Sequence, residues 1–273
     1  MFDCHTHLYD DQYALDLNQV LARAKDVGVK KSIVVSEDME SAIKVLKMCD
    51  NSMELAAGIG IHPCSVNVTD YDNQYLEIKT LIEQNHKNIC CIGEVGLDFT
   101  PNIMKSVLCK FGADTTHTID DLKKAQREVL RLFVDLSLKY DLTLNVHSRS
   151  AGRPTIQLLK ECKAQKVLLH CFDGSTKVAM DGIRSGYFFS VPANVKRSKQ
   201  MQDLVAALPI SQLLLETDSP ALPPTIDTSL DKQERNEPAN IIISAETIAE
   251  IKNISVDEVI RQTSINAINL FKL

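Results

Sequence analysis

The sequence predicts an α/β fold, a (β/α)8 barrel of the TIM type, and three observations lead to this prediction. Short apolar runs alternate with longer amphipathic stretches from one end of the chain to the other. The alternation repeats eight times, which is the pattern of parallel strands joined by helices. Isolated histidines and carboxylates follow several of the apolar runs, and in a barrel the carboxyl ends of all strands form one rim. We therefore expect one domain over residues 1–273.

The expected strands are short, several are rich in valine, isoleucine and leucine, and their sequences are typical of strands that are buried on both faces. They cover about residues 1–5, 32–35, 54–59, 89–93, 142–146, 166–170, 186–190 and 213–217. The expected helices cover about residues 14–28, 39–50, 72–86, 121–140, 154–163, 175–185, 198–208, 240–252 and 256–271. Two longer connections, about 98–120 and the proline-rich 220–239, are expected to be loops over the rim.

The composition argues against several classes of protein. No run of about 18 apolar residues predicts a membrane span, and the first residues lack the features of a signal peptide, so we expect a cytoplasmic or nuclear protein. The eight cysteines are therefore expected to be reduced thiols. A net charge of −6 argues against a general binder of duplex DNA, but not against an enzyme with a locally positive cleft. No surface pattern indicates an obligate protein partner, so a monomer is expected.

Ligand-type side chains stand at the ends of five expected strands. His5 and His7 are two positions apart on a strand, so both side chains point the same way. The others are Glu94, His147, His170 and Asp218. A single histidine at a strand end is more often a hydrogen-bonded structural residue than a ligand. Six such residues on one rim favour a metal site, and imidazoles with carboxylates suit Zn²⁺, Mn²⁺ or Fe²⁺ better than Mg²⁺.

Seven short motifs are distributed over nearly the whole chain. They are DCHTHL at residues 3–8, GIGIHP at 58–63, GEVGLD at 93–98, NVHSR at 145–149, HCFDG at 170–174, LETDSP at 215–220 and RNEP at 235–238. In kind and order they resemble the TatD family of metal-dependent deoxyribonucleases, within the amidohydrolase-like TIM barrels. The run at 145–155 and the long connection after Glu94 resemble the eukaryotic branch of TatD-domain-containing protein 3.

This resemblance implies a hydrolase that cleaves phosphodiester bonds, with 3′-to-5′ exonuclease action on single-stranded DNA or DNA 3′ ends. It also implies two divalent metal ions as cofactors, Zn²⁺, Mn²⁺ or Mg²⁺. Glu94 would bridge the two ions, at a separation of roughly 3.5–4 Å. One site would be completed by His5, His7 and Asp218, and the other by His147 and His170. Asp218 would also accept the proton of the attacking water, so Glu94 and Asp218 are the expected catalytic residues.

Further residues near the expected rim are candidates for substrate contact. His62 is interpreted as a phosphate or substrate contact, with a structural role as the alternative. Arg149 and Arg153 follow the fifth strand and can offer guanidinium groups to phosphate oxygens. Lys196 and Arg197 lie after the seventh strand, where they are either a solvated surface loop or part of a positive track for a nucleic-acid strand.

Three charged residues are expected to support the site. Asp3 and Glu216 would orient ligands, and Arg235 would anchor the last long loop. Two other functions stay open. One is a hydrolase of C–N or lactone bonds on the same metal ions, and the other is a metal-binding protein without catalysis. The basic residues near the rim favour phosphodiesters over neutral amides.

Overall fold

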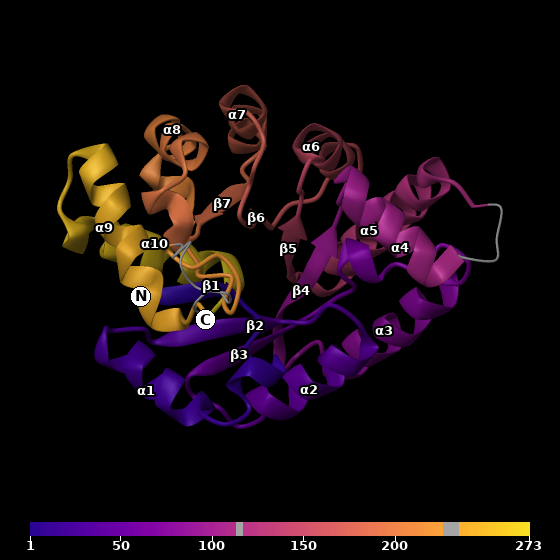
Figure 1. Ribbon diagram of the computed structural model, residues 1–273, viewed down its shortest axis with the longest axis horizontal. Helices are drawn as coiled ribbons and strands as arrows, with labels where there is room; N and C mark the ends of the chain where they lie inside the picture. Colours follow the sequence, from indigo (N-terminus) through magenta and orange to yellow (C-terminus); the bar gives the residue numbers. More distant parts are fainter. Residues whose placement is uncertain (113–116, 226–234) are drawn as a thin grey trace.

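The strands form one continuous sheet that curls into a barrel (Figure 1). This computed structural model describes residues 1–112, 117–225 and 235–273. Within them, eight parallel strands pair in the order of the chain, which confirms the predicted fold class. They are β1 (Phe2–Thr6), β2 (Lys31–Val35), β3 (Leu55–Ile59), β4 (Ile89–Gly96), β5 (Thr143–His147), β6 (Val167–Leu169), β7 (Phe188–Val191) and β8 (Leu213–Leu215).

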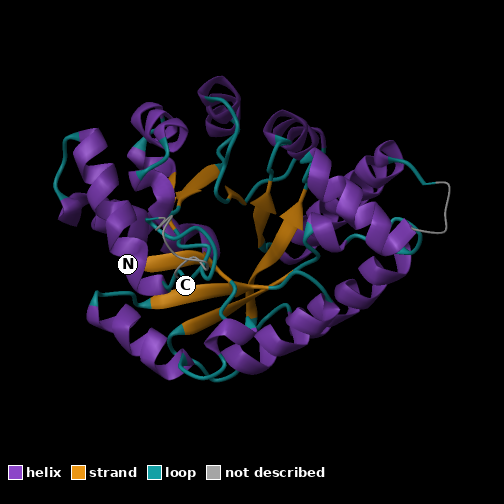
Figure 2. Ribbon diagram, in the orientation of Figure 1, coloured by secondary structure: helices purple, strands orange, loops and turns teal. Residues whose placement is uncertain are grey.

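Helices surround the sheet on its outer side (Figure 2). They are α1 (Leu17–Asp26), α2 (Met39–Cys49), α3 (Tyr71–Asn85), α4 (Pro101–Gly112), α5 (Ile119–Tyr140), α6 (Gly152–Glu161), α7 (Thr176–Arg184), α8 (Lys199–Ala207), α9 (Ile241–Lys252) and α10 (Val256–Phe271). Most of them bury an apolar stripe against the strands, as amphipathic helices do. Among the described residues, no helix is long and apolar enough to span a membrane.

The barrel closes between its first and last strands. Thr6 forms a parallel bridge with Ser219, just after β8. The amide of His7 donates to the Ser219 carbonyl at 2.8 Å, and the amide of Asp218 donates to the His5 carbonyl at 3.0 Å. The end of β1 therefore lies directly beside the segment that follows β8, although more than 200 residues separate them in the sequence.

The inside of the barrel is a packed core. One buried cluster contains a side chain from each even-numbered strand, Ile33, Cys91, Leu168 and Leu214. Alternate strands contribute layers of this kind in TIM barrels. Leu270 and Phe271 of α10 join the same cluster. The Thr143 hydroxyl, at the start of β5, donates to the Leu270 carbonyl at 2.5 Å. Helix α10 therefore closes the end of the barrel at which the strands begin, and the other end remains for polar side chains.

The prediction of a loop over 98–120 is wrong, because most of this segment is helical. Helix α4 occupies Pro101–Gly112, and α5 begins at Ile119. Pro101 occupies the first helical position, where its missing amide proton costs nothing. Met104 and Val107 are buried at a spacing of three residues, which fits one face of a helix. In the second predicted loop, residues 226–234 lie outside the described residues, and the part from 220 to 225 contains no helix or strand.

Candidate metal centre

The structure brings the six predicted ligands together at the carboxyl end of the barrel. His5 lies in β1, Glu94 lies within β4 rather than just after it, and His147 is the last residue of β5. His170 follows β6 and Asp218 follows β8. The glycine before Glu94 lets β4 approach β5 closely, because a Cβ atom at Gly93 would lie 2.6 Å from the Asn145 Cβ.

Four of the ligand atoms surround one point. His5 Nε2 and His7 Nε2 face each other at 3.2 Å. Each of them lies 3.5 Å from Glu94 Oε2, and 3.6 and 3.4 Å, respectively, from Asp218 Oδ1. Around a zinc ion with bonds of roughly 2.0–2.1 Å, tetrahedral ligand atoms are separated by about 3.3–3.4 Å. The donor set and its spacing therefore fit one divalent ion.

The other oxygen of Glu94 faces a second group of imidazoles. Glu94 Oε1 lies 2.7 Å from His147 Nδ1 and 2.7 Å from His170 Nε2. These two ring nitrogens are 3.2 Å apart. His62 Nε2 lies 3.6 Å from the same oxygen, so His62 is within ligand distance and not only at the periphery. The contacts of 2.7 Å have the length of hydrogen bonds, and a second ion would require these side chains to spread slightly.

Two residues that orient the histidines were missed by the sequence reasoning. His5 Nδ1 lies 2.9 Å from Asn145 Oδ1, and the Asn145 amide donates to the Cys4 carbonyl at 2.9 Å. His147 Nε2 lies 3.2 Å from Asp98 Oδ2. Such partners fix which ring nitrogen carries the proton and leave the other free for an ion. Their signal was the presence of Asn145 and Asp98 within the motifs at 145–149 and 93–98.

A third missed contact joins His7 to the rim. The Tyr9 hydroxyl donates to Glu37 Oε2 at 2.5 Å and lies 3.5 Å from His7 Nδ1. Burial, followed by the negative charge of Glu37, raises the pKa of Tyr9. Tyr9 is therefore neutral and can accept a hydrogen bond from His7.

Asp3 and Glu216 are buried next to the ligands. Asp3 accepts hydrogen bonds from the Thr217 amide at 3.0 Å and the Thr217 hydroxyl at 2.6 Å. Glu216 accepts from the Cys171 amide at 2.8 Å and the Ser190 hydroxyl at 2.7 Å. Burial raises the pKa of Asp3 to about 7 and that of Glu216 to about 8. Both carboxyl groups hold backbone or side-chain donors around the site.

The protonation of the histidines differs across the cluster. Burial lowers the pKa of His62 to about 3 and that of His170 to about 4, so both are neutral at pH 7. Burial also disfavours the charged form of His5, but Glu94 outweighs it and raises the pKa to about 10. At His147 burial is outweighed by Asp98 and Glu94, and the pKa rises to about 9. Without an ion, protonated His5 and His147 therefore balance the buried carboxylates.

Of the predicted substrate contacts, the structure places Arg149 beside the site. Its Nε and Nη2 atoms donate to Asp98 Oδ2 at 2.9 and 2.7 Å. Lys196 and Arg197 are exposed at the end of the turn that follows β7, and Arg197 donates to the Pro223 carbonyl at 3.4 Å. Arg153 is exposed on α6, where it lines a groove against α7.

Arg235 is paired with the segment that precedes α1. Its guanidinium donates to both carboxylate oxygens of Asp16 at 2.8 and 2.7 Å and lies over the Tyr13 ring, 4.5 Å from the ring centroid. The Asn236 side chain donates to the Thr217 carbonyl at 2.8 Å. The RNEP motif therefore fixes the end of the last loop beside Asp218.

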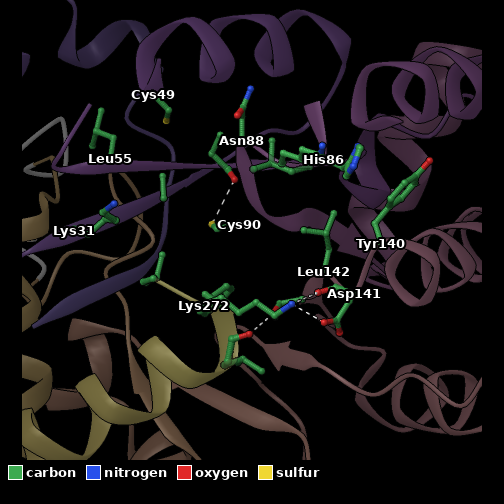
Figure 3. Close-up of a pocket in the computed structure, with 18 of the residues that line it drawn as sticks. Lys31, Cys49, Leu55, His86, Asn88, Cys90, Tyr140, Asp141, Leu142 and Lys272 are labelled. Atoms are coloured by element: carbon green, nitrogen blue, oxygen red, sulfur yellow. Dashed lines mark hydrogen bonds and ion pairs between the residues drawn. The ribbon is translucent and has the colours of Figure 1, made fainter. Parts of the chain in front are cut away.

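A separate cavity lies at the opposite end of the barrel (Figure 3). It has a volume of about 480 Å³ and is lined by residues that begin strands, such as Lys31, Leu55 and Thr143. Lys272 and Asp141 form an ion pair across its edge (Figure 3). None of the predicted ligands lines it, so this cavity is not the predicted site.

Comparison with known proteins identifies the family. The family model described as TatD related DNase matches residues 2–272. The chain belongs to the TatD family. Human Deoxyribonuclease TATDN3 is 43% identical over 279 residues, which cover 99% of this chain and 94% of that protein. The Uncharacterized metal-dependent hydrolase YabD of Bacillus subtilis is 32% identical, with 100% of this chain and 99% of that protein covered.

A solved structure agrees with this assignment. YjjV, a TatD homologue from Escherichia coli, superposes with a TM-score of 0.85 at 25% identity, covering 100% of this chain and 98% of that chain. The predicted family and its likeness to the TATDN3 branch are confirmed. This TatD protein is a metal-dependent hydrolase whose relatives carry the name deoxyribonuclease.

Proposed function

We propose that this TatD protein removes nucleotides from the 3′ ends of single-stranded DNA at a site with two divalent ions. One observation carries the proposal. Glu94 is buried, with one carboxylate oxygen toward His5 and His7 and the other toward His147 and His170. A carboxylate placed in this way can bridge two ions, which is the arrangement that many phosphodiesterases use. The family and the names of its members support DNA as the substrate.

The protein supplies different groups to the two ions. His5, His7 and Asp218 would hold one ion together with Glu94 Oε2, and His147 and His170 would hold the other with Glu94 Oε1. When bound, divalent ions make water more acidic and neutralise charge on a phosphate group. His170 is already neutral, so it offers a free ring nitrogen without losing a proton. Zinc or manganese suits this donor set best.

Asp218 is the proposed general base. Its side chain is 16% exposed and faces the mouth, whereas Glu94 is only 2% exposed. Burial would raise the pKa of Asp218, but a hydrogen bond to His7 and the charge of His5 lower it. Asp218 is therefore ionised at neutral pH and can accept a proton. Its backbone has φ of +55°, a left-handed conformation that costs energy in a non-glycine residue. The hydrogen bond that its amide donates to the His5 carbonyl helps to hold it there.

Basic side chains around the mouth would hold the DNA backbone. Arg149 lies next to the site, Lys196 and Arg197 lie on the turn after β7, and Arg153 lies farther out on α6. His62 would contact the phosphate at the metal site. These contacts read charge and not base identity, so the proposal predicts little sequence preference.

Two measurements test the proposal together. Elemental analysis of protein loaded with Zn²⁺ or Mn²⁺ should give two ions per chain, and Glu94→Ala should lower occupancy at both sites. Single-stranded DNA labelled at its 5′ end should then be shortened progressively, and a 3′ label should be released first. Release of the 5′ label first would overturn the polarity, and unchanged metal content in Glu94→Ala would overturn the bridge.

A hydrolase of C–N or lactone bonds on the same ions is the competing proposal. A panel of amides and lactones, assayed with the same metal-loaded protein, separates the two. Turnover of an amide or lactone with intact DNA would favour the competitor. A protein that binds two ions and turns over neither class would be a metal-binding protein without catalysis.

A further inference from the structure

One oxygen of Asp98 connects a predicted metal ligand with an exposed arginine. Asp98 Oδ2 accepts hydrogen bonds from Arg149 Nε at 2.9 Å and Nη2 at 2.7 Å. The same oxygen lies 3.2 Å from His147 Nε2. The other oxygen, Oδ1, accepts from the Thr100 amide at 2.8 Å. Both oxygens of this buried carboxylate therefore have partners, which come from the site and from its own loop, and Oδ2 also accepts from the Cys64 thiol at 3.6 Å.

The backbone around this group leaves it little freedom. The Asp98 amide donates to Gln126 Oε1 at 3.0 Å, and Gln126 donates to the Pro63 carbonyl at 3.1 Å. The Leu97 amide donates to the His147 carbonyl at 3.1 Å, and the Phe99 amide donates to the Arg149 carbonyl at 3.1 Å. Asp98 is consequently fixed against the end of β5 and the residues that follow it, which carry its two partners.

The two partners differ in their access to solvent. The Asp98 side chain is fully buried, whereas that of Arg149 is 47% exposed. Arg149 uses one edge of its guanidinium for Asp98. In the part of the chain that the structure describes, its Nη1 atom has no hydrogen-bond partner. A guanidinium held by one edge can present the rest of its donors to a phosphate in a fixed orientation.

The contact with His147 has a separate effect. A carboxylate only accepts hydrogen bonds, so it favours the proton on His147 Nε2. Nδ1 faces Glu94 and His170, so with an ion on that side the neutral ring would keep its proton on Nε2, where Asp98 accepts it. A neutral amide in the place of Asp98 would accept more weakly and could also donate, so it would remove this preference.

We propose that Asp98 is a positioning residue that serves both halves of the site. It holds His147 in the form that binds metal, and it fixes Arg149 as a receptor for a backbone phosphate of the nucleic acid beside the scissile bond. The inference rests on the proposed function, since it assumes a metal site and a phosphate substrate. It adds that the metal site and the phosphate receptor depend on one shared carboxylate.

The test uses binding, so it does not depend on catalysis. The variants are Asp98→Asn, Arg149→Ala, the double variant, and Asp173→Asn as a matched control. Asp173 is a carboxylate near the same loop that accepts from the Ser150 amide and contacts neither His147 nor Arg149. Zinc affinity is measured by competition with a coloured chelator. Affinity for a fluorescent single-stranded oligonucleotide is measured on metal-free protein.

Asp98→Asn should weaken zinc binding by about 10- to 100-fold, the usual effect of losing a partner of a ligating histidine. Arg149→Ala should leave zinc affinity unchanged. Both single variants should weaken oligonucleotide binding by about fivefold or more, and the double variant should be no worse than the weaker single variant, because the two residues act as one unit. Asp173→Asn should match the wild type in both measurements.

Three outcomes would overturn the inference while leaving metal-dependent hydrolysis intact. They are unchanged zinc affinity in Asp98→Asn, additive losses of oligonucleotide binding, and equal losses in the Asp173→Asn control. If Asp98→Asn does not fold, two measurements decide instead. Imidazole ¹⁵N shifts of the zinc-loaded wild type should show the His147 proton on Nε2. Arg149→Lys should bind the oligonucleotide as weakly as Arg149→Ala, since lysine cannot form the forked contact. A proton on Nδ1, or full binding by the lysine variant, would refute it.

Discussion

At the scale of single residues, Asp218 combines two properties that suit a general base at a metal site. It lies among buried histidines, yet it keeps part of its side chain open to the mouth. If it accepts the proton of the attacking water, Asp218→Asn should lower kcat by about 10²–10⁴. The ion held by His147 and His170 should remain, because neither residue contacts Asp218. Steady-state kinetics and elemental analysis on the same sample check this. Activity within a few-fold of the wild type, with both ions bound, would assign the base elsewhere.

The histidine pKa values predict how metal binding depends on pH. His5 and His147, with pKa values of about 10 and about 9, carry protons at pH 7 when no ion is bound. Ligation requires neutral imidazole, so binding must release these protons. Apparent metal affinity should therefore rise with pH through the neutral range and fall in acid. Titration calorimetry in two buffers of different ionisation enthalpy should show release of at least two protons at pH 7, and a release near zero would contradict the assignment.

At the scale of secondary structure, the order of the strands and the rim position of the ligands could be predicted, because both follow from local patterns. Helix α4 was not predicted, because the helical spacing of its apolar residues was not recognised. Asp98 and Asn145 were missed as site residues for a different reason. Their roles depend on contacts with His147 and His5 that cross from one strand to another, and local periodicity carries no information about such pairs.

The approach of β4 to β5 is closest at Gly96. Gly96 has φ of +147°, and a Cβ atom there would lie 2.0 Å from the His147 carbonyl oxygen. Gly96→Ala should lower the free energy of unfolding by about 3 kcal/mol or more, since both strain and overlap must be relieved by moving strands. Gly186→Ala is the matched control, with φ of +82° and no atom within 4 Å, and should cost about 1–2 kcal/mol. Urea unfolding of the metal-free variants compares the two. Equal losses of unfolding free energy would show that the close contact with the His147 carbonyl adds nothing to the cost of the Gly96 substitution.

At the scale of the whole molecule, the charge near the site differs in sign from the net charge of the chain. The chain carries a net charge of −6, yet exposed basic residues stand on the turn after β7 and beside the site. A local positive region can attract a nucleic-acid strand that the rest of the surface repels.

Removing rim charge should therefore change the salt dependence of DNA binding. Lys196→Ala and Arg197→Ala should each reduce the slope of log K against log salt by roughly 0.7 if each contacts one phosphate of a single strand. Lys47→Ala is the control, because this exposed lysine lies in the last turn of α2, at the far end of the barrel. Fluorescence anisotropy at several salt concentrations measures the slopes. Slopes equal to that of the control would mean that the two rim residues are simply solvated.

The seam between β1 and the segment after β8 also determines when the site can exist during synthesis. His5 and His7 leave the ribosome more than 200 residues before Asp218 and before Ser219, the backbone partner of His7. A nascent chain therefore carries this histidine pair without Asp218 while the residues between them are made. Contacts between such distant segments form late in folding. The complete ligand set consequently marks a finished barrel, and tight metal retention should report that the last strand has been added.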